Sequence, residues 1–370
     1  MAGLHILIPI HDFSAGGTEV IAFRLAEQWI AAGHRVTLLA GAADGAMRGR
    51  VPAGGNVRLI DPPVPRSAFS RLGLGKAMGP DAQQIAPDVV FIPGNFHFIL
   101  AHALKRALPG TPIVGKISNP MLPAGVLARF AGATGLMTRW FAPLDMVAAM
   151  SRGLEAEHRA MAPGSPVVTI TDPNVPGAQA IQPMRDRRQG KGPVRLLLIG
   201  RLEPQKDVPL ALRVVAALKK SLPVHLTVLG EGYLRPKIEG QVRSLGLERD
   251  VALPGFVDGI AAALDAADLL LITSRYEGGP AVAVEALARG VPVVSTDCSH
   301  FLRDLLVDPR LGRIVPSRDP AALAAAIIAQ LDSEPAPTEL LKAAVEPSRY
   351  GHAARAYLNL FQALCGNKSA

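Results

Sequence analysis

The sequence predicts an α/β protein with two Rossmann-like, doubly wound parallel-sheet domains in tandem. Near the N-terminus an apolar run over residues 4–9 precedes a polar loop, a segment with helical spacing over 18–32 and a second apolar run over 36–40. A parallel sheet covered by helices is the simplest fold for this order of strand, helix and strand. The alternation restarts near Arg195 after a proline-rich stretch, and 370 residues suit two domains of ordinary size.

Composition excludes several classes of protein. With 49% hydrophobic and 19% charged residues the chain can bury large cores, which excludes a disordered protein. The two cysteines, Cys298 and Cys365, are too few for a disulfide framework and suit a reducing compartment. No stretch reaches the roughly 18 apolar residues of a membrane span, so we expect a cytoplasmic protein.

Charge favours an anionic ligand or surface. The formal net charge is +8 and the isoelectric point is about 9.8, values that suit a phosphorylated metabolite or lipid headgroups. Aromatic residues make up only 5% of the chain and are not interleaved with arginines as base-stacking platforms would require. We therefore expect no nucleic-acid partner.

The most informative segment follows the strand predicted to end at Thr273. That strand delivers Glu277 to a glycine-rich turn, and a helix that starts at Pro280 runs to a stop at Gly290. Unpaired backbone amides at the helix start lie at the positive end of the helix dipole and could hold a diphosphate. Glu277 and Glu285 could accept hydroxyl hydrogen bonds on either side. A nucleotide sugar has this layout of hydroxyls, diphosphate and ribose hydroxyls.

Two cations follow the first strand of the second half. Arg201 and Lys206 lie on the loop that begins at Gly200, at the same sheet edge as Glu277. A guanidinium fork and an ammonium there could meet phosphate oxygens and offset the negative charge on a departing diphosphate.

In the first half, Gly16 and Gly17 join strand to helix and permit close backbone approach to a phosphate or sugar. The spaced-glycine dinucleotide fingerprint is incomplete here, which disfavours a nicotinamide dehydrogenase. No run of His, Asp and Glu has metal-ligand spacing, so we expect neither a metal nor a cofactor.

Polar side chains follow the next two predicted strands of this half. Asn95 and His97 come after one strand, and Ser118 and Asn119 come after the other, at the carboxyl edge of the sheet. For His97 a structural and a functional role both remain open. Residues 122–150 read equally as a basic amphipathic helix in a bilayer interface or as a core helix.

Taken together, these motifs resemble the retaining glycosyltransferases of the GT-B fold that form family 4, or glycosyl transferases group 1. The resemblance covers almost the whole chain, and its most specific part is Glu277 with Glu285 eight positions on. Its other motifs are Gly16-Gly17, Ser151-Arg152-Gly153-Leu154, Asp172-Pro173-Asn174-Val175, Gly200-Arg201-Leu202, Lys206-Asp207, Gly230-Glu231-Gly232 and Gly255-Phe256-Val257.

The resemblance implies roles for individual residues. Arg201 and Lys206 would bind the donor diphosphate, Glu277 the sugar hydroxyls and Glu285 the ribose. With His97, the first three form the candidate catalytic set. The candidate donor-binding residues are Gly16, Gly17, Gly200, Phe256, Val257, Gly278, Gly279, Pro280, Ala281, Val282 and Glu285, with main-chain groups near Phe256 and Val257 meeting the base.

One position departs from the family pattern. The first-domain histidine of the family usually follows the strand that here ends in Ile117, where this chain has Ser118 and Asn119. His97 could fill the space from the neighbouring loop. Asn95, Ser118 and Asn119 are the acceptor-side candidates.

The resemblance also implies a domain plan and a mechanism. Residues 1–172 would form the acceptor-side domain, 173–193 a linker, 194–346 the nucleotide-sugar domain, and 347–370 a helix that crosses back to the first domain. The two domains would face a central cleft. Attack on the face of the departing diphosphate would retain the anomeric configuration without a protein nucleophile or a metal.

The expected function is transfer of a hexose from a uridine diphosphate donor to a hydroxyl of a glycan, lipid-linked or polysaccharide acceptor, in polysaccharide biosynthesis. A peripheral position at the inner face of an anionic membrane is part of this expectation. Two alternatives remain: a non-catalytic protein that binds nucleotide sugars or anionic lipids, and a sugar-nucleotide epimerase. An epimerase would convert the donor with no acceptor present.

Overall fold

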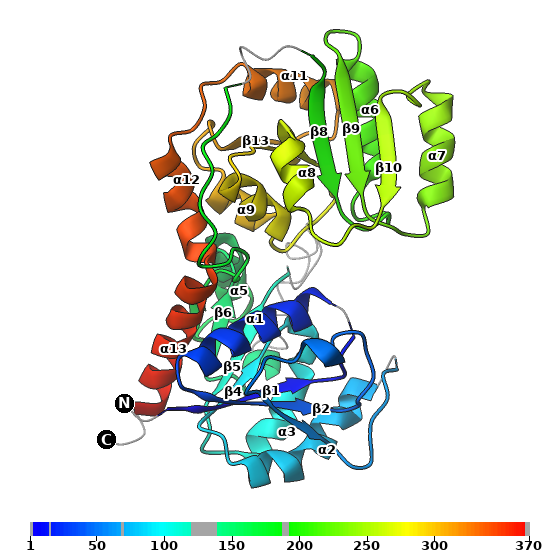
Figure 1. The fold of residues 1–370 in the computed structure, drawn as a ribbon. Coiled ribbons are helices and arrows are strands. Elements are labelled where there is room, and N and C mark those ends of the chain that lie inside the picture. Colours follow the sequence, from blue (N-terminus) through cyan, green and yellow to red (C-terminus); the bar gives the residue numbers. More distant parts are fainter. Residues whose placement is uncertain (1–2, 15, 68–69, 120–138, 187–191, 367–370) are drawn as a thin grey trace. The chain divides into compact units, whose positions relative to one another are not determined.

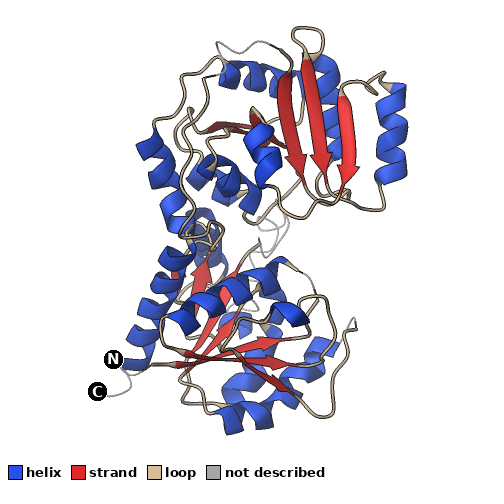
Figure 2. Ribbon diagram, viewed as in Figure 1, coloured by secondary structure: helices blue, strands red, loops and turns tan. Residues whose placement is uncertain are grey.

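The computed structural model describes residues 3–14, 16–67, 70–119, 139–186 and 192–366. The chain forms two compact units, one of Met1–Gly177 with Pro347–Ala370 and the other of Ala178–Glu346. Each unit contains one parallel sheet flanked by helices (Figures 1 and 2). The prediction of two doubly wound parallel sheets is confirmed.

The first unit contains a sheet of seven parallel strands in the order β3-β2-β1-β4-β5-β6-β7. The strands are β1 (His5–Ile10), β2 (Arg35–Ala40), β3 (Asn56–Leu59), β4 (Val89–Ile92), β5 (Ile113–Ile117), β6 (Met146–Ala149) and β7 (Val167–Thr169). The helices and short 3-10 turns are α1 (Gly17–Ala31), η1 (Arg48–Arg50), α2 (Ser70–Ile85), η2 (Asn95–His97), α3 (Ile99–Ala107), α5 (Arg152–Met161) and α13 (Tyr350–Gly366). The strand order reverses direction between β1 and β4, which is the topological switch point of the sheet.

Alternating side chains of β1 divide the interior of this unit into two cores. Ile6 and Ile8 lie in the core that α1 and α13 cover, whereas Leu7 lies in the core that α2 and α3 cover. Successive side chains of a strand point to opposite faces, and a strand covered on both faces must be apolar throughout. This is why the central strands read as continuous apolar runs.

Aromatic side chains join the last helix, α13, to the first, α1. The two helices are red and blue in Figure 1. The ring of Trp29 on α1 lies 5.3 Å from those of Phe91 on β4 and Phe361 on α13, and Tyr357 lies 5.0 Å from Phe91. Trp29 Nε1 also donates to the carbonyl of Ala354, at 3.1 Å. Helix α13 is therefore part of the first unit's core.

Replacing Phe361→Ala should destabilise the first unit by about 3–5 kcal/mol, because a buried aromatic ring is replaced by a cavity. Both tryptophans of the chain, Trp29 and Trp140, lie in this unit, so urea unfolding followed by tryptophan fluorescence reports on it. Asn359→Ala, at an exposed position of the same helix, is the matched control. Equal urea midpoints for the two variants would show that α13 is not part of this core.

The second unit contains six parallel strands in the order β10-β9-β8-β11-β12-β13, with its switch point between β8 and β11. The strands are β8 (Val194–Ile199), β9 (Val224–Leu229), β10 (Val251–Gly255), β11 (Leu269–Ile272), β12 (Val293–Thr296) and β13 (Gly312–Val315). The helices are α6 (Val208–Leu218), α7 (Arg235–Ser244), α8 (Ala261–Ala266), α9 (Ala281–Ala288), α10 (His300–Leu305), α11 (Pro320–Leu331) and α12 (Thr338–Val345), and the turn η4 (Glu346–Ser348) leads back to the first unit.

Residues of the expected linker are tied to both units. The amides of Asn174 and Val175 donate to the carbonyl of Ser348, and Tyr350 N donates to Val175 O, within the first unit. Gln182 N donates to the carbonyl of Ala288 at the end of α9, within the second unit.

The segment 122–150, for which a membrane-surface helix and a core helix were both expected, lies partly outside the described residues. Residues 122–138 are not described, whereas Phe141 and β6 are buried in the first unit's core. None of the helices within the described ranges is both long and apolar enough to span a bilayer.

Candidate functional site

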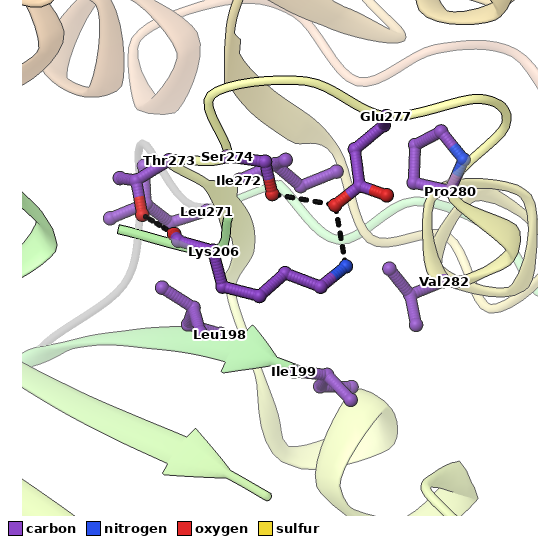
Figure 3. Close-up of a pocket in the computed structure, with 10 residues that line it drawn as sticks. All are labelled: Leu198, Ile199, Lys206, Leu271, Ile272, Thr273, Ser274, Glu277, Pro280 and Val282. Carbon is purple, nitrogen blue, oxygen red and sulfur yellow. Dashed lines mark hydrogen bonds and ion pairs between the residues drawn. The ribbon is translucent and has the colours of Figure 1, made fainter. Parts of the chain in front are cut away.

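The candidate site of the second unit lies at the switch point of its sheet. Lys206 is carried by the loop after β8, and Glu277 by the loop after β11, the neighbouring strand. The two side chains point toward each other, and Lys206 Nζ lies 2.5 Å from Glu277 Oε1 (Figure 3). Loops at a switch point diverge and leave a crevice at the carboxyl ends of the strands, which is where open α/β sheets bind ligands.

The loop after β8 brings Lys206 across Gly200. A Cβ atom at Gly200 would lie 2.8 Å from Lys206 Cε and 2.9 Å from Cδ, so any other residue there would push the lysine stem away. Thr273 Oγ1 at the end of β11 donates to the carbonyl of Lys206, at 2.9 Å. The sequence motif that joins Gly200 to Lys206 therefore has a steric reason.

The carboxylate of Glu277 is oriented by its own loop. Ser274 Oγ donates to Glu277 Oε1 at 2.6 Å, and the amide of Glu277 donates to the carbonyl of Cys298 at 2.7 Å. Among the described residues both donors to this carboxylate, Ser274 and Lys206, end on Oε1. Oε2 is thus left to accept a hydrogen bond from a ligand hydroxyl.

Helix α9 begins beside this pair. The expectation that Pro280 is its first helical residue is wrong by one position, because Pro280 has extended ψ at 101° and is the N-cap. No side chain within the described residues caps the helix, so the first amides keep the partial positive charge of a helix start. Pro280 and Val282 line a pocket together with Lys206 and Glu277 (Figure 3).

Glu285 lies just over one turn into α9 and is half-buried, and Gly290 ends the helix with φ at +67°. Gly278 is fixed from the other side, because Ser299 Oγ donates to its carbonyl at 2.6 Å. The structure thus brings the glycine turn, the helix start and one carboxylate together, as the sequence predicts.

Three other expected residues of this unit lie further out. Arg201 is exposed and pairs with Glu203 of its own loop, Nη1 to Oε1 at 3.0 Å, and not with Glu277. Phe256 and Val257 follow β10, two strands away from β8 in the sheet, and the Phe256 side chain is 78% exposed. These residues share the carboxyl edge of the sheet with the Lys206–Glu277 pair without contacting it in the interactions described.

In the first unit, Gly16 and Gly17 lie at the start of α1, but a carboxylate already faces this helix start. A Cβ on Gly16 would lie 2.4 Å from Glu19 Oε2, and Glu19 is buried. Arg66 Nη2 approaches Glu19 Oε1 at 3.6 Å, and Arg66 Nε pairs with Asp12 Oδ2 at 2.7 Å. A phosphate at these glycines would have to displace Glu19, an obstacle that glycine spacing does not reveal.

His97 lies on η2 and is 3% exposed, and neither ring nitrogen has a hydrogen-bond partner among the described residues. Burial, reinforced by the positive charges of Arg71 and Arg66, lowers the pKa of His97 to about 3. The ring is therefore neutral near pH 7.

The remaining polar candidates are brought together. Asn95 Oδ1 accepts from the amide of Ser118 at 2.8 Å, and Asn95 Nδ2 donates to the carbonyl of Asn119 at 2.7 Å. Beneath them the buried Lys116 donates to Ser118 Oγ at 2.5 Å and pairs with Asp172 at 2.9 Å. Lys116 was not predicted as a site residue, although a lysine inside the apolar run of β5 is a signal that could have found it.

The first unit should lose stability as pH falls from about 6.5 toward 3. Since the folded-state pKa of His97 lies below that of an unfolded histidine, the unfolded chain takes up a proton first, and stability present above pH 6.5 declines. Through His97 alone, the free energy of unfolding should be about 2 kcal/mol lower at pH 5 than at pH 7.5. In urea titrations at both pH values, His97→Leu should narrow the difference between midpoints, and His102→Leu, at an exposed site, should not. An unchanged difference in His97→Leu would contradict this assignment.

No cluster of three or more His, Cys, Asp or Glu side chains suited to a metal occurs within the described ranges. The candidate site of the second unit instead consists of an uncapped helix start, an ammonium and a carboxylate at a switch point. They lie on one of two doubly wound parallel sheets, and two such sheets in one chain place the protein in the GT-B-like class of folds.

Comparison with known families identifies the chain more closely. Residues 15–172 match the family described as Glycosyltransferase Family 4, and residues 193–333 match the family described as Glycosyl transferases group 1. The chain belongs to this family of GT-B glycosyltransferases.

Curated relatives agree with this assignment, and solved structures share the fold. Glycogen synthase of Mycobacterium tuberculosis is 32% identical over 185 residues, covering 49% of this chain and 44% of the relative. An N-acetylgalactosaminyltransferase of Campylobacter jejuni, named for an undecaprenol-linked acceptor, is 33% identical over 141 residues, covering 38% of this chain and 39% of the relative. The aligned part thus spans less than half of either relative. The structure of Anabaena HepE in complex with UDP-glucose superposes with a TM-score of 0.66 at 18% identity, over 99% of each chain.

Proposed function

We propose that the protein is a retaining, metal-independent glycosyltransferase that moves a hexose from a uridine diphosphate donor to a hydroxyl of a glycan or lipid-linked acceptor. The observation that carries this proposal is the Lys206–Glu277 pair beside the uncapped start of α9, at the switch point of the second sheet. Membership of the glycosyltransferase family supports it.

The diphosphate would lie against the start of α9. Amides of Ala281 and Val282 and the positive end of the dipole suit its oxygens, and Lys206 adds a full charge. Arg201 is exposed, and the long side chain of this residue can turn from Glu203 toward a more highly charged partner. These cations would stabilise the negative charge that develops as the glycosidic bond to the diphosphate breaks.

Carboxylates would fix the two sugars of the donor. Glu277 Oε2 would accept a hydrogen bond from a hydroxyl of the transferred hexose, while Ser274 and Lys206 donate hydrogen bonds to Oε1. Glu285, about one helical turn further on, would accept hydrogen bonds from the ribose hydroxyls. The exposed loop at Phe256 and Val257 would meet the base through main-chain groups.

In the proposed reaction the acceptor oxygen attacks the anomeric carbon on the face that the diphosphate leaves. The bond from that carbon to the diphosphate oxygen breaks, the bond to the acceptor oxygen forms, and the acceptor proton passes to the departing diphosphate. Configuration is retained and no protein nucleophile is consumed. Asn95, Ser118 and Asn119 would contact the acceptor side, with His97 as a neutral hydrogen-bonding group. Gly16 and Gly17 would lie near the donor only once Glu19 is displaced from the start of α1.

Names of relatives support the choice of substrates. HepE is described in complex with UDP-glucose, and the Campylobacter protein is named for an undecaprenol-linked acceptor. The net charge of +8 suits both an anionic donor and an anionic membrane surface, at whose inner face the protein would act in polysaccharide biosynthesis.

Glu277→Gln should lower transfer about 10²–10³-fold, because an oriented carboxylate that meets the reacting sugar is removed. A panel of UDP-, GDP- and ADP-hexoses is incubated with glycan and lipid-linked acceptors, and the anomeric configuration of the product is read by NMR. Glu248→Gln, an exposed carboxylate on the same unit, is the control.

Three outcomes would contradict the proposal: an inverted linkage, full activity in Glu277→Gln, or epimerised donor without acceptor. UDP at 100 times its Kd should also stabilise the wild-type protein by about 2.7 kcal/mol. Stabilisation by UDP with no transfer to any acceptor would favour a binding protein over an enzyme.

Transfer should be unaffected by EDTA. Lys206, Arg201 and the start of α9 would neutralise the diphosphate in place of a divalent cation, so initial rates with EDTA and with added Mg²⁺ or Mn²⁺ should agree within about twofold. Loss of activity in EDTA that Mn²⁺ restores would show that these groups are insufficient.

A further inference from the structure

Arg318 links the two loops of the candidate site from a distant part of the second unit. It follows β13, the edge strand, and directly precedes Asp319, the N-cap of α11. Its side chain reaches past the end of β12 to the loops after β11 and β8, the two central strands. No motif in the sequence marks this residue.

The guanidinium has partners on both loops. Nη1 donates to the carbonyl of Ser274 and Nη2 to the carbonyl of Thr273, both at 2.9 Å, on the loop after β11. Nη2 also pairs with Asp207 Oδ2 at 2.6 Å, on the loop after β8. One planar group thus holds both loops, and its fork geometry suits several acceptors at once.

Each residue that accepts a hydrogen bond from Arg318 either neighbours Lys206 in the chain or is hydrogen-bonded to Lys206 or Glu277. Asp207 follows Lys206 directly in the chain, and Ser274 Oγ donates to the Glu277 carboxylate. The spacing between ammonium and carboxylate therefore depends on where the guanidinium places the two backbones.

Arg318 supplies hydrogen-bond donors to backbone carbonyls that have left the strand ladder. Thr273 and Ser274 are buried, and their carbonyls lie at the end of β11, where the ladder no longer provides donors. Asp207 is also buried and has a φ of +44°, a conformation that is strained for a residue other than glycine. Charge-assisted hydrogen bonds from a guanidinium can hold such a backbone.

We propose that Arg318 is a positioning residue of the transfer reaction: it sets the separation and orientation of Lys206 and Glu277 without contacting the substrate. This inference rests on the proposed function. Its role differs from general support of the fold, because Asp207 also pairs with Arg275 at 3.0 Å and Thr296 Oγ1 also donates to the carbonyl of Ser274. Removal of Arg318 should therefore loosen the two loops and leave the unit folded.

The kinetic test compares Arg318→Met and Arg318→Lys with a control, Arg310→Met. In the wild type Arg310 forms a partly exposed ion pair with Asp308 in the same unit. We expect Arg318→Met to lower kcat/KM for the donor by up to about 100-fold, as misplacement of reacting groups does. Arg318→Lys should be intermediate, because one ammonium cannot reproduce the fork. Arg310→Met should match the wild type.

A double variant separates positioning from folding. If Arg318 acts through Lys206, then Arg318→Met should lower kcat/KM by a much smaller factor in the Lys206→Met variant than in the wild type. A merely structural role would lower the activity of both proteins by the same factor. Equal factors, or an Arg318→Met variant as active as Arg310→Met, would overturn the inference.

Hydrogen exchange tests the same idea without turnover. Amides of residues 273–278 and 206–207 should exchange faster in Arg318→Met than in Arg310→Met, while the strands keep their protection. Should the wild type transfer no sugar, the proposed function fails but this comparison still tests whether Arg318 holds the loops. Unchanged exchange in these segments would show that it does not.

Discussion

The arrangement of the second unit follows from one constraint: two neighbouring parallel strands, β8 and β11, are followed by helices on opposite faces of the sheet. Helix α6 contributes to the core that α11 also covers, whereas the buried residues of α9 lie outside that core. The loops after the two strands must therefore separate at the sheet edge. Opposite charges on Lys206 and Glu277 bridge this separation, and Arg318 holds the backbones beneath them. The strand order thus determines where the charged side chains of Lys206 and Glu277 meet.

The central strands could be predicted from sequence because both of their faces are buried. In β8 the run Leu196–Leu198 is apolar throughout, and so is the equivalent part of β1. The edge strands β3, β7 and β13 were not predicted, since an edge is less fully covered and tolerates residues such as Asn56 in β3 or Arg313 in β13. Helix α2 was hidden by Pro80 and its glycines, although Gly75 packs against α3 where a larger residue would not fit.

The site could be predicted only where its chemistry is local in the chain. Glu277 and the start of α9 form one continuous motif after a strand, and Lys206 stands on a short loop with Gly200. Arg318 and Lys116 could not be found in this way. The partners of Arg318, and Asp172 as the ion-pair partner of Lys116, lie tens of residues away in the chain and are brought near only by the fold. Glu19, which covers the glycines of α1, is also evident only in three dimensions.

The return of α13 to the first unit has a consequence for biosynthesis. Ribosomes deliver Trp29 and Phe91 early, yet their aromatic partner Phe361 emerges only after the entire second unit has been translated. During that interval the apolar side chains of the first unit that α13 normally covers are exposed to solvent. Partly folded chains with such a surface are prone to aggregate and are typical clients of chaperones. Completion of the polypeptide, and not local folding order, therefore governs when this unit matures.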